Sequence, residues 1–185
     1  MSYLALDLSK RSTGWAHWAP GMAVPACGTW ELGGDLTSAG LAFLRLHQRI
    51  NEVHSVTPLE CVIYEKPLDP ATMGRHSSFD VAFVLIGLAA HVDSYCEAKR
   101  ILRCSSAHQA TWRKHFLGPM KRGTRSMSLK EFAVERCRQL GILPGKHDAA
   151  EAAGILDYRL HLDGITPPWR MEHVLTEQLV GGGRR

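Results

Sequence analysis

Three short segments of the chain place carboxylates inside otherwise apolar sequence. Residues 3–9 and 61–67 resemble short buried strands with an acid near the carboxyl end, and residues 147–153 resemble a helix with two acids three positions apart. An ionised carboxylate in a buried sheet destabilises the fold unless a cation compensates it. Convergence of such acids would favour a bound divalent metal, so the pattern indicates metal-dependent phosphoryl transfer. The four acids are Asp7, Glu65, Asp148 and Glu151.

Composition limits the class of protein. A chain of 185 residues with 45% hydrophobic content suits one domain, which we expect over residues 1–165, followed by a C-terminal extension over residues 166–185. No apolar run is as long as the roughly 18 residues of a membrane span, so we expect no membrane partner. The five cysteines include no C-x-x-C pair and predict reduced thiols. With no secretory segment at the N-terminus, these features predict a cytoplasmic protein.

The pattern along the chain predicts strands first and helices later. Short connections between the first three strands indicate an antiparallel meander. We expect a capping box at the start of the helix that begins at Ser128, with Glu131 as its partner. The expected strands are Tyr3–Leu8, Thr13–Trp18, Cys27–Leu32, Leu59–Glu65 and Arg100–Cys104. The expected helices are Asp35–Val53, Phe79–Lys99, Ala107–Phe116, Ser128–Leu140 and Lys146–Leu162.

This order of elements is that of the ribonuclease H-like fold. It is an α/β fold with a five-stranded mixed sheet, in which the three N-terminal strands are antiparallel and helices flank the sheet. The positions of the acids on this order resemble the RuvC Holliday-junction resolvase family, from Tyr3 to about Leu162. The motifs that carry the resemblance are the strand-one aspartate Asp7, the strand-four pair Glu65-Lys66, and the helical pattern Asp148-Ala149-Ala150-Glu151.

The resemblance implies a metal-dependent, structure-specific DNA endonuclease. Its substrate would be the four-way (Holliday) junction or related branched DNA, cut by phosphodiester hydrolysis during DNA recombination and repair. The implied metal ligands and catalytic residues are the four acids, which would hold two Mg²⁺ or Mn²⁺ ions, with Asp7 between them. Hard divalent cations prefer such oxygen ligands. A homodimer is implied as well, because a junction has two strands to cut symmetrically.

Two positions depart from the family pattern. Glu151 stands where the family usually has Asp, so a longer side chain must reach the metal. Some members have His at the position that aligns with Asp148, and His147 is the next residue. Neighbours on a helix point about 100° apart, so only one of the two can face the same metal well. We favour Asp148, which shares a face with Glu151, and keep His147 as a candidate metal or catalytic residue.

Basic residues in two segments are the candidates for DNA contact. Arg75 precedes the long apolar helix, whose N-terminal amides also attract phosphate. The other segment, near residues 113–126, contains Gly and Pro and suits an exposed loop, although a solvated charged surface has the same composition. Phosphate contacts are made mainly by Lys and Arg. The candidates in that segment are Lys114, Lys121, Arg122 and Arg125.

Other functions are compatible with parts of this pattern. A general branched-nucleic-acid nuclease of the same fold would use the same four acids. An actin-like ATPase or sugar-kinase half has a first phosphate motif similar to residues 7–14, but it needs a second lobe for which 185 residues leave no room. A DNA-binding relative without activity would have no need of all four acids. Each acid taken alone could instead cap a turn or a first helical turn.

Overall fold

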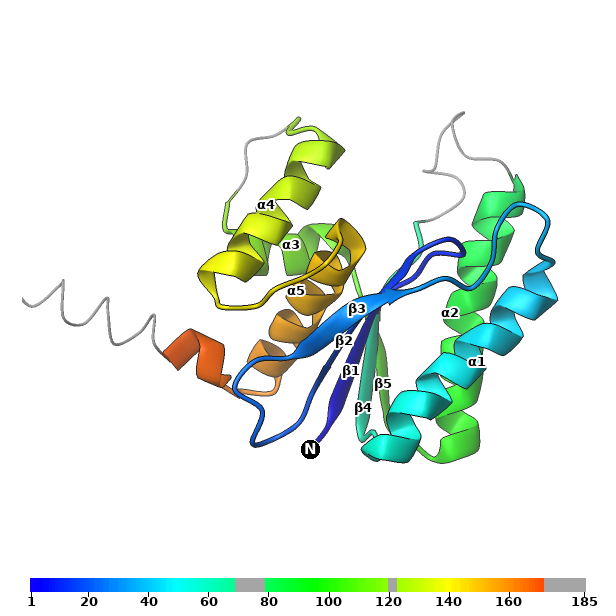
Figure 1. Cartoon of the computed structure of the whole chain (residues 1–185), viewed down its shortest axis with the longest axis horizontal. Coiled ribbons are helices and arrows are strands. Elements are labelled where there is room, and N and C mark those ends of the chain that lie inside the picture. The colour runs from blue at the N-terminus through cyan, green and yellow to red at the C-terminus, as the bar shows by residue number, and fades with distance from the viewer. Residues whose placement is uncertain (69–78, 120–122, 172–185) are drawn as a thin grey trace, which may run out of the picture.

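The computed structural model describes residues 1–68, 79–119 and 123–171, which form one mixed five-stranded sheet covered by helices on both faces (Figure 1). The sheet order is β3-β2-β1-β4-β5. β1 pairs antiparallel with β2 and β2 with β3, whereas β4 runs parallel to both β1 and β5. This confirms the expected α/β fold class. The strands are β1 (Tyr3–Asp7), β2 (Thr13–Trp18), β3 (Ala26–Trp30), β4 (Cys61–Glu65) and β5 (Arg103–Ala107).

The helices divide between the two faces of the sheet. α1 and α2 cover one face, and α3, α4 and α5 lie on the other (Figure 1). Each face has its own hydrophobic core, and α5 is buried along almost its whole length. The helices are α1 (Ala39–Val56), α2 (Phe79–Lys99), α3 (Gln109–Leu117), α4 (Ser126–Gln139) and α5 (His147–Leu162).

The central strand β1 is apolar at successive positions because both of its faces are covered. Tyr3 and Ala5 pack into the core beneath α5, while Leu4 and Leu6 pack into the core beneath α1 and α2. Successive strand residues point to opposite faces, so a doubly covered strand needs a continuous apolar run. The run ends at Asp7, which lies at the carboxyl end of the strand and is only partly exposed.

The fifth strand begins later than the sequence predicts. The expected Arg100–Cys104 is wrong in its boundaries, because Arg100 adopts a left-handed conformation with a φ of 57°. The Ile101 N–H then donates to the Cys96 carbonyl at 2.8 Å. A hydrogen bond that joins residues i and i+5 across a left-handed residue is typical of a helix C-terminus. Arg100 and Ile101 therefore form the end of the helix, just after Lys99, and cannot begin a strand. β5 therefore covers Arg103–Ala107.

Helix starts also differ from the expectation, including that of α3, which begins at Gln109 and not at Ala107. α1 begins at Ala39, not Asp35, because the Ser38 hydroxyl accepts the Leu41 N–H and caps the helix. α4 begins at Ser126 with Arg125 as N-cap, and no side chain caps it. Ser128 therefore lies inside the helix, and the predicted capping box is wrong. Gly123, with a φ of 84°, turns the chain just before this start.

By length and composition, α2 is the one described helix that could cross a membrane. Core helices of proteins outside membranes pass the same test, and here Leu88, Val92 and Cys96 are buried against the sheet.

At the other end of the described chain, Trp169 is buried and its ring lies edge-on to that of Trp18, at 5.9 Å between centroids. The beginning of the predicted C-terminal extension therefore packs against the core.

Candidate active site

Asp7 and Glu65 lie at the same edge of the sheet because β1 and β4 are parallel and both end there. The first turn of α5 crosses this edge and brings Asp148 and Glu151 to it. Gly14, the β2 partner of Asp7, allows the close approach. A Cβ atom on Gly14 would lie 1.9 Å from the Asp148 carbonyl oxygen, so any larger residue would push the start of α5 away.

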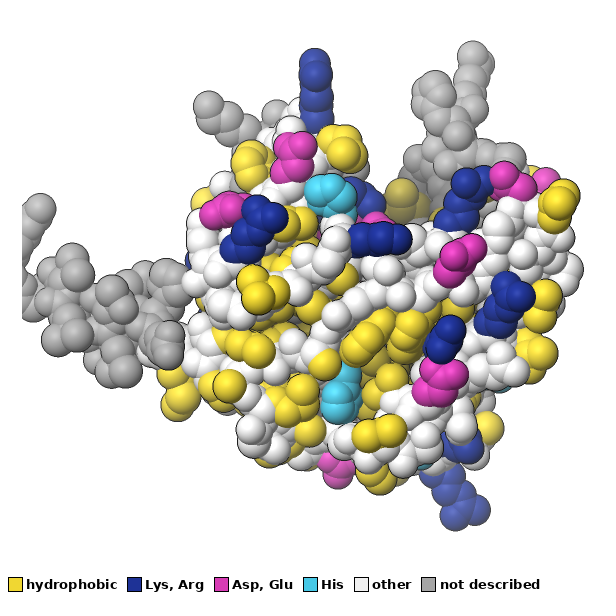
Figure 2. All heavy atoms as spheres, in the orientation of Figure 1, with side chains coloured by type: hydrophobic (Ala, Val, Ile, Leu, Met, Phe, Trp, Pro, Cys, Tyr) yellow, Lys and Arg dark blue, Asp and Glu magenta, His cyan; other side chains and the backbone are white. Residues whose placement is uncertain are grey.

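Three of the four acids converge tightly. Ligand oxygens of Asp7, Asp148 and Glu151 all lie within 4.8 Å of one another. Glu65 lines the same cavity, which has a volume of about 540 Å³, but it is held to one side. Its two oxygens accept hydrogen bonds from Gln109 Nε2 at 2.9 Å and Trp112 Nε1 at 2.8 Å. Charged side chains of both signs gather at this edge of the molecule, between the two sets of helices (Figure 2).

Burial, together with the charges of neighbouring carboxylates, raises the pKa of two of the acids. Burial, and then the charges of Glu151, Glu65 and Asp148, raise the pKa of Asp7 well above its usual value, while Lys130 lowers it. Burial also raises the pKa of Glu65, and the hydrogen bond from Trp112 opposes this shift. Among the described residues, no side chain hydrogen-bonds to the Asp7 carboxylate. The site therefore favours a cation beside Asp7.

Two basic side chains compensate the other acids. Lys130 Nζ of α4 lies 3.0 Å from Asp148 Oδ1 and 3.3 Å from Glu151 Oε2. Arg113 of α3, itself almost buried, forms an ion pair with Glu151. The Ser12 hydroxyl donates to Asp148 Oδ2 at 2.7 Å. Glu151 and Asp148 are thus each bound by basic or hydroxyl groups, and Asp7 is the acid whose charge is least compensated.

Sequence reasoning missed these supporting residues. The basic segment near residue 113 was expected to face DNA, but Arg113 points from α3 towards α5 and pairs with Glu151, while its neighbour Lys114 is exposed. Lys130 lies beside Glu131 in an ordinary charged helix, and nothing in the sequence distinguishes it. Gln109 and Trp112 share a helical face at positions i and i+3, which was the only available signal that they act together.

Comparison with known proteins matches this chain to solved structures but to no known family model or curated sequence. No protein-family model and no curated protein sequence matches this sequence. Thermus thermophilus RuvC in complex with a Holliday junction substrate matches with a TM-score of 0.62 and 14% identity, over 84% of this chain and 90% of that chain. The chain shares the fold of RuvC. A second Thermus thermophilus RuvC structure matches with a TM-score of 0.59 and 14% identity, over 87% of this chain and 97% of that one.

A eukaryotic structure extends the likeness. The yeast mitochondrial Holliday junction resolvase Ydc2 matches with a TM-score of 0.58 and 11% identity, over 96% of this chain and 83% of that chain. At identities this low, the match describes the shared fold. The function must therefore be inferred from the side chains that this RuvC-like fold carries.

On this RuvC-like fold, Asp148 lines both the acid cavity and a neighbouring groove, whereas His147 lines the groove and not that cavity. Asp148 belongs to the acid group, whereas His147 lines a neighbouring groove and has a buried Nδ1 with no hydrogen-bond partner. The rotation of α5 about its axis therefore brings Asp148, and not His147, to Asp7 and Glu151. The donor set at this point consists of carboxylate oxygens alone, which fits a hard divalent cation such as Mg²⁺ or Mn²⁺.

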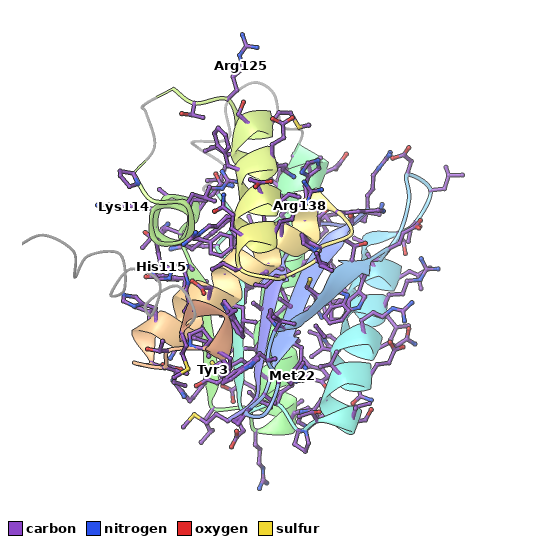
Figure 3. The ribbon with its side chains drawn as sticks, turned by 60° about the vertical axis from the view of Figure 1, so that its left-hand side comes forward. Tyr3, Met22, Lys114, His115, Arg125 and Arg138 are labelled. Atoms are coloured by element: carbon purple, nitrogen blue, oxygen red, sulfur yellow. The ribbon has the colours of Figure 1, made fainter. Side chains whose placement is uncertain are left out.

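The residues expected to bind DNA are only partly described. Arg75, Lys121 and Arg122 lie outside the described residues. Lys114 lies on the outer side of α3 and Arg125 extends beyond the first turn of α4, as Figure 3 shows. Neither side chain lines the cavity that holds the acids.

Proposed function

We propose that this protein is a metal-dependent, structure-specific DNA endonuclease that resolves four-way junctions and acts in the cytoplasm. The observation that carries the proposal is the convergence of Asp7, Asp148 and Glu151 on a RuvC-like resolvase fold. A buried acid cluster in which Asp7 has no basic partner at hydrogen-bonding distance suits a divalent cation better than it suits a structural role.

The chemistry of the reaction requires a proton to leave water and negative charge to collect on a leaving oxygen. Asp7, Asp148 and Glu151 would hold Mg²⁺ or Mn²⁺, with Glu65 at the edge of the same cavity. When bound, divalent metal lowers the pKa of water and stabilises the leaving oxygen. Lys130 and Arg113 place two fixed positive charges beside the acids. These charges can stabilise the additional negative charge that develops on the phosphate.

The test is cleavage of a labelled four-way junction by the purified protein with Mg²⁺ or Mn²⁺. A nicked duplex, a flap and a splayed arm are cut in parallel. We expect paired, symmetric nicks on the junction, with 5′-phosphate and 3′-hydroxyl ends. Equal cutting of every branched substrate would indicate a general branched-nucleic-acid nuclease instead. Stabilisation by nucleotide without any cleavage would favour the ATPase alternative and overturn the proposal.

The proposal includes a homodimer, in which each subunit cuts one strand of the junction. The outer side of α2 supports it, because Phe79, Phe83 and Ile86 have exposed fractions of 82%, 53% and 44%. The rings of Phe79 and Phe83 stack at 6.4 Å between centroids. A continuous exposed apolar surface of this kind is typical of an interface.

A charge placed on this surface tests the dimer. We expect Phe83→Glu to convert a dimer to a monomer in analytical ultracentrifugation and to uncouple the two nicks, because it buries a charge in the interface. The matched control is Leu102→Glu, which changes a side chain that is 91% exposed and follows the C-terminal end of α2, at the opposite end from Phe83. A monomeric unaltered protein that still makes paired nicks would contradict the dimer.

A further inference from the structure

A second groove, of about 560 Å³, lies directly beside the acid cluster. It is formed by α4 and by the segment that leads into α5. Lys130 and Asp148 line both this groove and the cavity of the active site. A nucleic acid strand with one phosphate on the acids can therefore continue into the groove without leaving the surface.

The groove carries more positive than negative charge. Among its lining residues, Lys130, Arg138 and Lys146 are basic and Asp148 alone is acidic. Asp148 is already bound by Ser12 and Lys130. Lys146 is exposed, and its side chain has no hydrogen bond or ion pair within the described part of the chain. Arg138 has a 64% exposed side chain and only a loose contact, at 3.8 Å, with Glu135.

The start of α5 adds hydrogen-bond donors that have no partners. Its N-cap residue, Lys146, makes no side-chain hydrogen bond to the first turn. The first N–H groups of a helix then remain open to an anion. His147 also lines the groove and has a buried Nδ1 without a partner. A buried polar atom normally has a partner, so His147 can offer a further hydrogen bond to a ligand in the groove.

We propose that this groove binds a backbone phosphate of the cut strand, next to the phosphate that lies on the acids. The proposal rests on the proposed nuclease function and adds the residues that set the path of the strand. Arg138 and Lys146 supply the charge, and the start of α5 supplies hydrogen bonds. Arg138 is in the last turn of α4, far from Arg125 at its start (Figure 3). We therefore expect the strand to follow this groove towards the end of α4 that lies opposite Arg125.

The test compares a double variant, Arg138→Ala with Lys146→Ala, with a matched control. The control is Arg49→Ala with Lys99→Ala, in which Arg49 likewise pairs with a glutamate three residues away, Glu52. Binding of the whole protein to a four-way junction is measured in EDTA over a range of salt concentrations. Removing one phosphate contact should lower the slope of log K against log salt by about 1, and the control should leave it unchanged.

A second measurement locates the phosphate. Single phosphates near the cleavage site are replaced by neutral methylphosphonates. At one position the replacement should weaken binding by the unaltered protein but not by the double variant, because the contact is already lost. If the losses in binding affinity are additive at every position, or if the double variant binds like the control, the groove does not bind a phosphate.

The two proposals fail in different ways. If the unaltered protein cuts junctions while the double variant binds like the control, only the proposal that the groove binds phosphate is wrong. If the unaltered protein binds no branched DNA, both the nuclease function and the phosphate binding in the groove are wrong.

Discussion

At the scale of single residues, Asp7 is the most unusual group in the protein. It is a carboxylate at the end of an apolar strand, and the negative charges of three other acids disfavour its ionised form. A carboxyl group whose pKa is raised in the folded state stabilises the fold below its unfolded pKa, near 4, and this contribution is lost as pH rises through the folded pKa. In the metal-free protein, Asp7 should therefore destabilise the fold increasingly as the pH rises from about 4 towards neutral.

Asp7→Asn should stabilise the metal-free protein while removing its activity. Asparagine has a similar shape and no charge, so we expect the melting temperature in EDTA at pH 7.5 to rise by roughly 2–8 °C. Mg²⁺ should raise the melting temperature of the unaltered protein but not of the variant. Cleavage should be lost while junction binding is kept. A lower melting temperature in EDTA, or continued cutting by a pure preparation, would contradict the assignment of Asp7.

Trp112 is a second residue whose role depends on one atom. Its indole N–H holds one oxygen of Glu65, and its ring is fully buried between α3 and α5. We expect Trp112→Phe to lower cleavage or metal affinity by about 10- to 100-fold, because Glu65 loses its orientation. Junction binding should not change. Trp15→Phe is the control, since the Trp15 ring stacks on Trp30 and holds no carboxylate. Equal effects of the two substitutions would show that Trp112 serves only packing.

At the scale of elements, the contact between β2 and α5 decides where Asp148 lies. Gly14→Ala should shift the start of α5, because the new Cβ would meet backbone at 1.9 Å rather than a flexible side chain. We expect a loss of about 1–3 kcal/mol in the free energy of unfolding, together with a weaker stabilisation by Mg²⁺. Gly40→Ala on α1 is the control, since its Cβ would meet nothing within 4 Å. Unchanged metal stabilisation in Gly14→Ala would contradict this dependence.

The ends of elements were the least predictable part of the fold. The apolar runs of β1 and β4 could be found from sequence because burial on two sides leaves a continuous local pattern, and α2 could be found because it is apolar along most of its length. The starts of β5 and α4 could not be found, because they depend on single backbone conformations at Arg100 and Gly123. Those conformations are set by the hydrogen bonds that end one element and by the packing of the next.

At the scale of the whole molecule, Asp157 joins three parts of the chain. This buried carboxylate on α5 accepts hydrogen bonds from His115 of α3 and from Trp169 and Arg170 of the C-terminal segment. Burial raises the pKa of Asp157, but the hydrogen bonds from His115, Arg170 and Trp169 outweigh burial and lower it to about 2. Its contribution to stability is therefore complete above about pH 4 and is lost as pH falls towards about 2.

Asp157→Asn should destabilise the protein by about 3 kcal/mol at neutral pH, because it leaves Arg170 and His115 without a charged partner. The loss should shrink below about pH 4, where Asp157 itself becomes protonated in the unfolded chain and its advantage declines. Urea denaturation at several pH values measures both effects. A pH-independent loss would show that the carboxylate charge is not what holds the C-terminal segment.

The sequence by itself determined the fold class and the positions of the four acids on it. Both are local properties, since an apolar run, its period and the acid that ends it can be read from adjacent residues. Only the tertiary structure decided which side chains surround the acids. The pairing of Arg113 and Lys130 with Glu151, the restraint of Glu65 by Trp112, and the choice of Asp148 over His147 all depend on how each helix is rotated about its own axis. That rotation is set by packing between elements that are far apart in the chain, and no local pattern records it.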